Sequence, residues 1–103
     1  MMNFSTFWSQ LTKDTSSEKE FFTKTKKPFT ATYNNGIIII KPSKIPVYER
    51  PINRNEFSKV WSKASKLSAG QRYVLKNYHD ETFHSSYIIA IMKSIVVDKD
   101  MLD

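Results

Sequence analysis

A capping signal at Asn53 constrains the fold more than any other feature of this chain, because it marks where a helix starts and which side of it is buried. The Asn53 side chain can accept a hydrogen bond from the amide of Glu56, and the Glu56 side chain can reach back to the amide of Asn53, so the pair predicts a capping box. Ile52 and Phe57 flank this box as a hydrophobic staple, which fixes the angle at which the chain enters the helix. We therefore expect a helix to begin at Asn53.

The helix predicted after this cap has one apolar side and one basic side. Apolar residues recur at helical spacing and predict a buried stripe. They are Phe57, Val60, Trp61, Ala64 and Leu67. The opposite side carries Lys59, Lys63 and Lys66. Gly70 is placed to stop the helix, so we expect it to run to about Leu67.

A β-hairpin is predicted in the first half of the chain. Pro28–Tyr33 alternates apolar residues with threonines, Asn35-Gly36 is a strong hairpin-turn signal, and Ile37–Ile40 forms the returning strand. Because the returning strand is apolar on both sides, we expect it to be paired or to be covered on both faces. Two prolines make Ser43–Val47 an edge or a loop. Shorter strands are expected at Glu20–Thr25 and Val47–Ile52.

Further helices are predicted towards both ends of the chain. The first spans residues 1–13, and its apolar face would dock on the core or on a second copy of the chain. That face consists of Phe4, Phe7, Trp8 and Leu11. The closing helix is expected to be capped by Ser85 or Ser86, with Phe83 leading into it. Its buried stripe is predicted to be Tyr87, Ile88, Ile91 and Ile95. Gln71–Tyr78 could form a helical turn or a short strand, of which the helical turn is favoured, and residues 97–103 are interpreted as an acidic tail.

The length and composition of the chain predict one domain with one modest core. The chain has 103 residues, 40% hydrophobic and 14% aromatic, which is too short for two ordinary domains and too aromatic for a disordered chain. The predicted elements mix strands that are adjacent in sequence with separate helices. We therefore expect a single α+β domain over residues 1–103, with a small antiparallel sheet of three or four strands packed against two or three helices.

The sequence lacks the residues or segments that several classes of protein need for their function. Cysteine is absent, which excludes disulfides, thiolate zinc sites and a cysteine nucleophile. No apolar run reaches the length of about 18 residues that a membrane span needs, and the N-terminus lacks a basic signal-peptide region, so we expect a cytoplasmic location. His79–His84 gathers two histidines and two acids, but no second cluster completes a metal site. We expect no cofactor, no metal and no enzymatic activity.

Positive charge is concentrated in the middle of the chain. The net charge is +6, and the segment from Lys19 to Lys76 contains thirteen Lys and Arg residues but only three acidic residues. Such a surface favours nucleic acid as a partner, although it also serves solubility alone. The residues expected to face phosphates are Lys59, Lys63, Lys66, Arg72 and Lys76. Lysines also flank the predicted hairpin at Lys24, Lys26, Lys27, Lys41 and Lys44. The alternative is a protein-interaction module, or a homodimer through the N-terminal helix or the isoleucine strand, without nucleic acid.

The order of the predicted elements, and the packing residues within them, are similar to those of a known kind of domain, which bears on the fold more than on the activity. Between residues 28 and 96 the chain combines a strand, a glycine turn, an aliphatic strand, a Glu-Phe-x-x-Val-Trp helix and a closing Ser-Tyr-Ile-Ile-Ala-Ile helix. In this order it resembles a small accessory domain of bacterial restriction and mobile-element proteins. The matching residues are Phe29, Gly36, Ile37 to Ile40, Arg50, Ile52, Glu56, Phe57, Trp61 and Ser86 to Ile91. The resemblance implies a role accessory to a nuclease or helicase. This sequence contains no such enzyme domain, so three alternatives stay open: the chain acts alone, as a cargo protein of a mobile element, or with a separate subunit.

Overall fold

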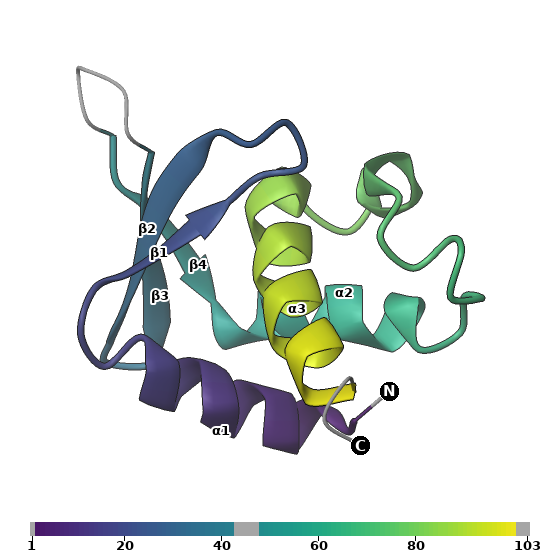
Figure 1. The fold of residues 1–103 in the computed structure, drawn as a ribbon, viewed down its shortest axis with the longest axis horizontal. Coiled ribbons are helices and arrows are strands. Elements are labelled where there is room, and N and C mark those ends of the chain that lie inside the picture. Colours follow the sequence, from purple (N-terminus) through teal and green to yellow (C-terminus); the bar gives the residue numbers. More distant parts are fainter. Residues whose placement is uncertain (1, 43–47, 101–103) are drawn as a thin grey trace.

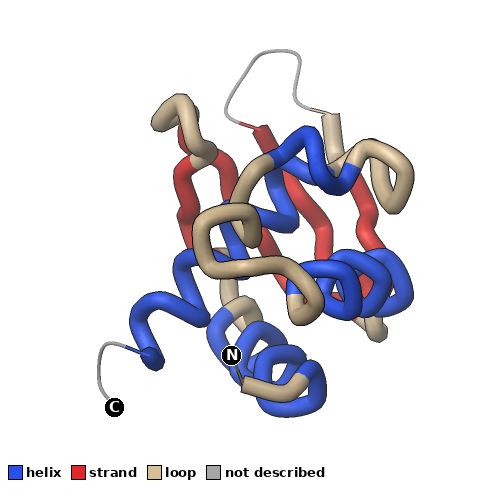
Figure 2. The backbone as a smooth tube through the Cα atoms, turned by 90° about the vertical axis from the view of Figure 1, so that its right-hand side faces the viewer, coloured by secondary structure: helices blue, strands red, loops and turns tan. Residues whose placement is uncertain are grey.

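The structure is a computed structural model that describes residues 2–42 and 48–100. Within these residues, four antiparallel strands form one sheet in the order β1-β2-β3-β4, and three α-helices gather on one side of it (Figures 1 and 2). The predicted α+β class is therefore confirmed. The elements in chain order are α1 (Phe4–Asp14), β1 (Lys19–Phe22), β2 (Pro28–Asn34), β3 (Ile37–Pro42), β4 (Arg50–Asn53), α2 (Arg54–Ala64) and α3 (Ser85–Asp100). The expected loop at 43–47 lies outside the described residues.

The β2–β3 hairpin forms where the sequence predicts it. Asn34 pairs with Ile37, which leaves Asn35 and Gly36 as a two-residue turn. Both turn residues have positive φ, 49° at Asn35 and 85° at Gly36, as a type I′ turn requires. Asparagine and glycine adopt this conformation more readily than other residues, so the turn sets the register of the two strands.

The sheet buries one face and leaves the other partly open. The inner face supplies six buried side chains to the core: Phe21, Phe29, Ala31, Ile38, Ile40 and Ile52. On the outer face, Ile37 is 36% exposed and Ile39 is partly exposed. Of the two alternatives expected for β3, coverage of both faces is not the one formed, because the helices gather on one side only (Figures 1 and 2). β3 is instead protected by its neighbours, since it pairs with β2 along one edge and with β4 along the other.

Helix α1 docks on the core of its own chain. Phe7 and Leu11 are buried, and the ring of Phe7 stacks on that of Trp61 with centroids 4.6 Å apart. At the end of the helix, Thr15 is buried, its hydroxyl donates to the Leu11 carbonyl at 2.7 Å and its carbonyl accepts from the Tyr33 amide at 2.8 Å. These bonds tie α1 to strand β2. Of the two docking options open from the sequence, the structure shows the one on the core.

Helix α2 begins as predicted and ends earlier than predicted. The Asn53 side chain accepts from the Glu56 amide at 2.9 Å, which confirms the N-cap. The last helical residue is Ala64 rather than Leu67, and Gly70 lies further on without the positive φ of a helix stop. The stripe that the sequence predicts nevertheless faces the core, where Phe57, Val60, Trp61 and Ala64 are buried.

The segment between α2 and α3 departs from the predicted helical turn. Residues 71–73 form turns, and only Leu75–Tyr78 makes a short 3₁₀ helix. Tyr78 is fully buried there, and its hydroxyl donates to the carbonyl of Arg72. This bond closes the segment on itself, so that a compact loop rather than a helix leads towards α3.

Helix α3 contains the buried stripe that its spacing predicts. Ile88, Ile91 and Ile95 are buried, and Tyr87 packs against the core from a partly buried position. Neither expected serine caps the helix, because the amides of Tyr87 and Ile88 bond to the carbonyl of His84 and Ser85 is already helical. Phe83 precedes the helix, as expected, and its side chain is 100% exposed. The helix continues to Asp100, so residues 97–100 of the expected acidic tail are helical.

Candidate functional site

Two of the five predicted phosphate-facing residues are engaged inside the chain. The Arg72 guanidinium donates to the carbonyls of Ala64 and Leu67 at 3.3 and 3.4 Å. It therefore binds the carbonyls at the C-terminal end of α2, where a cation is favoured. The Lys63 ammonium lies 3.3 Å from a carboxylate oxygen of Glu81. The remaining three predicted residues, Lys59, Lys66 and Lys76, are exposed.

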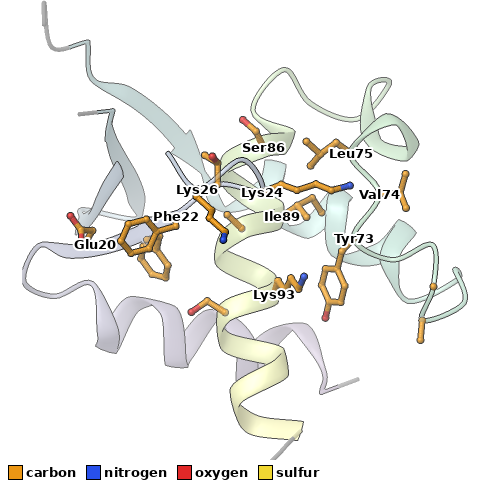
Figure 3. A pocket seen from close by; sticks show the side chains of 16 residues that line it. Glu20, Phe22, Lys24, Lys26, Tyr73, Val74, Leu75, Ser86, Ile89 and Lys93 are labelled. Carbon is orange, nitrogen blue, oxygen red and sulfur yellow. The ribbon is translucent and has the colours of Figure 1, made fainter. Parts of the chain in front are cut away.

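A groove in another part of the surface gathers lysines and aromatic rings. It lies between β1 with the turn that follows it and residues 69–75, with α3 between them (Figure 3). Its volume is about 690 Å³. The exposed lysines that line it are Lys24, Lys26 and Lys93, and the aromatic residues are Phe21, Phe22 and Tyr73. Among its described lining residues, Glu20 is the one acid. We refer to this feature as the β1–α3 groove.

A tight turn between β1 and β2 brings two of the lysines to the groove. The Thr23 amide donates to the Lys27 carbonyl at 2.9 Å, and the Lys26 amide donates to the Thr23 carbonyl at 2.8 Å. The Thr23 hydroxyl also accepts from the Lys27 amide at 3.1 Å. These bonds hold Lys26 at φ 65°, a left-handed conformation that is uncommon for lysine. The backbone of the turn therefore determines where Lys24 and Lys26 emerge.

Successive side chains of a β-strand point to opposite faces, so the two phenylalanines of β1 lie on different sides of the strand. Phe21 is buried and stacks on Phe29, with ring centroids 5.7 Å apart. Phe22 points to the opposite side and is 56% exposed. Across the groove, the Lys93 ammonium lies 5.9 Å from the centroid of the Tyr73 ring, within the range of a cation–π contact. Phe22 thus presents an exposed ring on one side of the groove, and on the other side the ring of Tyr73 lies beside the Lys93 ammonium.

The apolar part of the groove comes from α3 and the loop before it. Ile89 is buried, and Ala90, Val74 and Leu75 are partly buried. Between these side chains and the three ammonium groups, a ligand would meet an apolar surface with positive charge near it. A site of this composition suits a molecule that has both anionic groups and flat apolar parts.

A second polar cluster joins α2 to the loop before α3. One carboxylate oxygen of Glu56 lies 2.9 Å from His84 Nδ1 and accepts from the Thr82 hydroxyl at 2.9 Å. The Thr82 hydroxyl in turn accepts from the His84 amide at 2.9 Å. The return bond of the expected capping box to the Asn53 amide is not formed, because the carboxylate is engaged with these two distant partners. This cluster holds the loop in place and does not line the groove.

Among the side chains that the structure describes, in residues 2–42 and 48–96, no three acid or histidine side chains converge as a metal ion would require. Within residues 2–42 and 48–100, none of the helices combines the length and the apolar character needed to cross a membrane. The two histidines of the loop before α3 are used differently, since His84 pairs with Glu56 and His79 is exposed.

Comparison of the sequence with protein-family models and with curated proteins gives no match, and comparison of the fold with solved structures gives none. The resemblance to accessory domains of restriction and mobile-element proteins therefore stays a prediction. The lysines that flank the hairpin are visible in the sequence, and two of them reach the β1–α3 groove. Phe22 and Lys93 carry no local signal, because only the folded chain brings β1 beside α3.

Proposed function

We propose that this protein is a nucleic-acid-binding accessory protein whose contact site is the β1–α3 groove. The observation that carries the proposal is the convergence of Lys24, Lys26 and Lys93 on a groove that also presents aromatic rings. Lysine ammonium groups contact phosphates as point charges, and aromatic side chains stack on bases. The net charge of +6 would attract a polyanion towards this surface.

The proposal is one of binding without catalysis. His84, the histidine held in a defined pair, is oriented by Glu56 outside the groove. A general base would have to lie within hydrogen-bond reach of the reacting group. DNA as the nucleic acid, a cytoplasmic location and an origin in a mobile element are further parts of this proposal, and they rest on the charge and on the sequence resemblance.

Two matched triple variants test which lysines contact phosphates. The groove variant carries Lys24→Gln, Lys26→Gln and Lys93→Gln. The comparison variant removes the same charge from the exposed positions that the sequence favours: Lys59→Gln, Lys66→Gln and Lys76→Gln. Affinity for DNA and RNA oligonucleotides would be measured by fluorescence anisotropy over a series of salt concentrations. All six lysines are exposed, so both variants should melt within a few degrees of the parent.

The salt dependence of binding separates the outcomes. Each lost phosphate contact removes about 0.7–0.9 units from the slope of log affinity against log salt, so the groove variant should lose about two units or more. The comparison variant should keep most of the parent slope. The opposite result would move the interface to α2 and the loop after it. Absence of salt-sensitive binding in the parent would overturn the proposal and favour the interaction module, whose association would use the part-exposed Ile37 and Ile39.

A further inference from the structure

We infer that the β1–α3 groove takes a single nucleic-acid strand in preference to a duplex, with an unpaired base resting on Phe22. The inference depends on the proposed function and narrows it to one class of ligand. Three observations support it: the exposed ring of Phe22, the size and apolar lining of the groove, and the direction of the backbone groups along the free edge of β1.

The first observation is the ring of Phe22. It is 56% exposed at a site lined by three lysines, whereas its neighbour Phe21 is 3% exposed in the core. In a duplex the bases stack on one another, so the surface offered to the protein consists of phosphates, sugars and base edges. A duplex would use the lysines and leave the ring in water. A single strand can place a base on the ring while its phosphates meet the ammonium groups.

The second observation is the size and lining of the groove. Its volume of about 690 Å³ falls in the range of about 300–1,000 Å³ that is typical of sites for small organic molecules. Ile89 and Ala90 line the groove from α3, and Figure 3 shows Ile89 close to Lys24 and Lys26 of the turn. A strand with splayed bases can lay the flat face of a base on this apolar surface, whereas the stacked bases of a duplex hide their faces from it.

The third observation concerns the backbone of β1. Thr23 and Lys27 continue the register that pairs Phe21 with Phe29, and the Thr23 amide donates to the Lys27 carbonyl. Hydrogen-bonded pairs alternate along antiparallel strands, so Glu20 and Phe22 direct their amides and carbonyls away from β2. β1 is an edge strand of the sheet, and both residues line the groove. These groups can bond to the Watson–Crick edge of an unpaired base, an edge that a duplex conceals.

The test compares ligands and variants by fluorescence anisotropy at one low salt concentration. The ligands are a single strand of about ten nucleotides, within the usual site size of such proteins, its duplex, and an abasic strand with the same number of phosphates. The variants are Phe22→Ala, Phe22→Trp and Phe83→Ala. Phe83 is a matched control, because it is 100% exposed and does not line the groove.

We expect the single strand to bind at least tenfold more tightly than the duplex and the abasic strand. Phe22→Ala should weaken single-strand binding about five- to a hundredfold, the effect of losing one stacked base, and should leave the salt slope unchanged. Phe22→Trp should retain the affinity, and Phe83→Ala should bind like the parent. Melting temperatures close to that of the parent would show that the exposed ring was removed without unfolding the chain.

The outcomes distinguish this inference from the proposed function. Equal binding of single strand and duplex, or equal affinity of Phe22→Ala and Phe83→Ala, would overturn the inference while salt-sensitive binding left the proposed function standing. Absence of salt-sensitive binding to every ligand would overturn both. The free edge of β1 also suits an extended peptide. If an acidic peptide bound more tightly than every oligonucleotide and Phe22→Ala weakened it, the groove would be a peptide site and the inference would be wrong.

Discussion

The Glu56 carboxylate should contribute more to the stability of this fold than a local helix cap can. In a capping box its partner would be the Asn53 amide, three residues away, and the loss would be about 1 kcal/mol. In the structure one oxygen of the carboxylate bonds to Thr82 and His84, which are 26 and 28 residues away in sequence. Replacing Glu56 by Ala removes both long-range contacts at once.

The size of the effect follows from these two bonds. Hydrogen bonds to a charged group contribute about 1.5–3 kcal/mol each, and the Glu56 side chain is 26% exposed, so the lower end of this range applies. A carboxylate in the first turn of a helix adds about 0.3–1 kcal/mol. We expect Glu56→Ala to lower the free energy of unfolding by about 3–4 kcal/mol. For a domain of this size that corresponds to a fall in melting temperature of about 12–32 °C.

Chemical denaturation followed by tryptophan fluorescence measures this loss, since Trp61 lies in the core beside α1. Glu49→Ala is the control, because the Glu49 side chain is 61% exposed and its ion pair with Lys41 spans 3.7 Å. It should cost less than about 0.5 kcal/mol. A double-mutant cycle with His84→Ala should show a coupling of about 1 kcal/mol or more. If Glu56→Ala were no less stable than Glu49→Ala, the long-range role of the carboxylate would be refuted.

Two further stability predictions follow from burial. Ile38→Lys should prevent folding or lower the free energy of unfolding by more than about 4 kcal/mol, since Ile38 is 0% exposed, whereas Ile39→Lys on the open face should lower it by about 1 kcal/mol. Urea titrations of the two variants measure these losses. Equal losses would mean that both faces of the strand are covered. Burial raises the pKa of Tyr78 above its ordinary value of 10.0, against the lowering effect of Arg72, so the neutral hydroxyl stabilises the fold below pH 10 and this contribution is lost as the pH rises further. Tyr78→Phe should lower the free energy of unfolding by about 1–2 kcal/mol at pH 7, and its stability should fall less steeply than that of the parent above pH 10. If the variant lost stability above pH 10 as steeply as the parent, the Tyr78 hydroxyl would not be the cause of that loss.

Most secondary structure could be predicted from the sequence because its signals act over a few residues. The turn at Asn35 and Gly36 needs only the backbone preferences of those two residues. The N-cap at Asn53 and the apolar stripe of α3 are likewise local. The end of α2 escaped prediction, because Arg72 binds the carbonyls of Ala64 and Leu67 from a turn that no local pattern marks.

The candidate site could be predicted only in part from the sequence, because the fold decides which partners lie near each long charged side chain. The sequence shows how many lysines the chain carries, but a long side chain takes whichever partner the fold brings near. Lys63 pairs with Glu81, 18 residues away, whereas Lys59 and Lys66 remain exposed. Lys93 reaches the groove only because α3 packs beside β1. The sequence by itself thus determined the elements, the hairpin register and the excess of positive charge. The tertiary structure decided which cations pair inside the chain and which line the β1–α3 groove, because it alone sets distances between residues far apart in the chain.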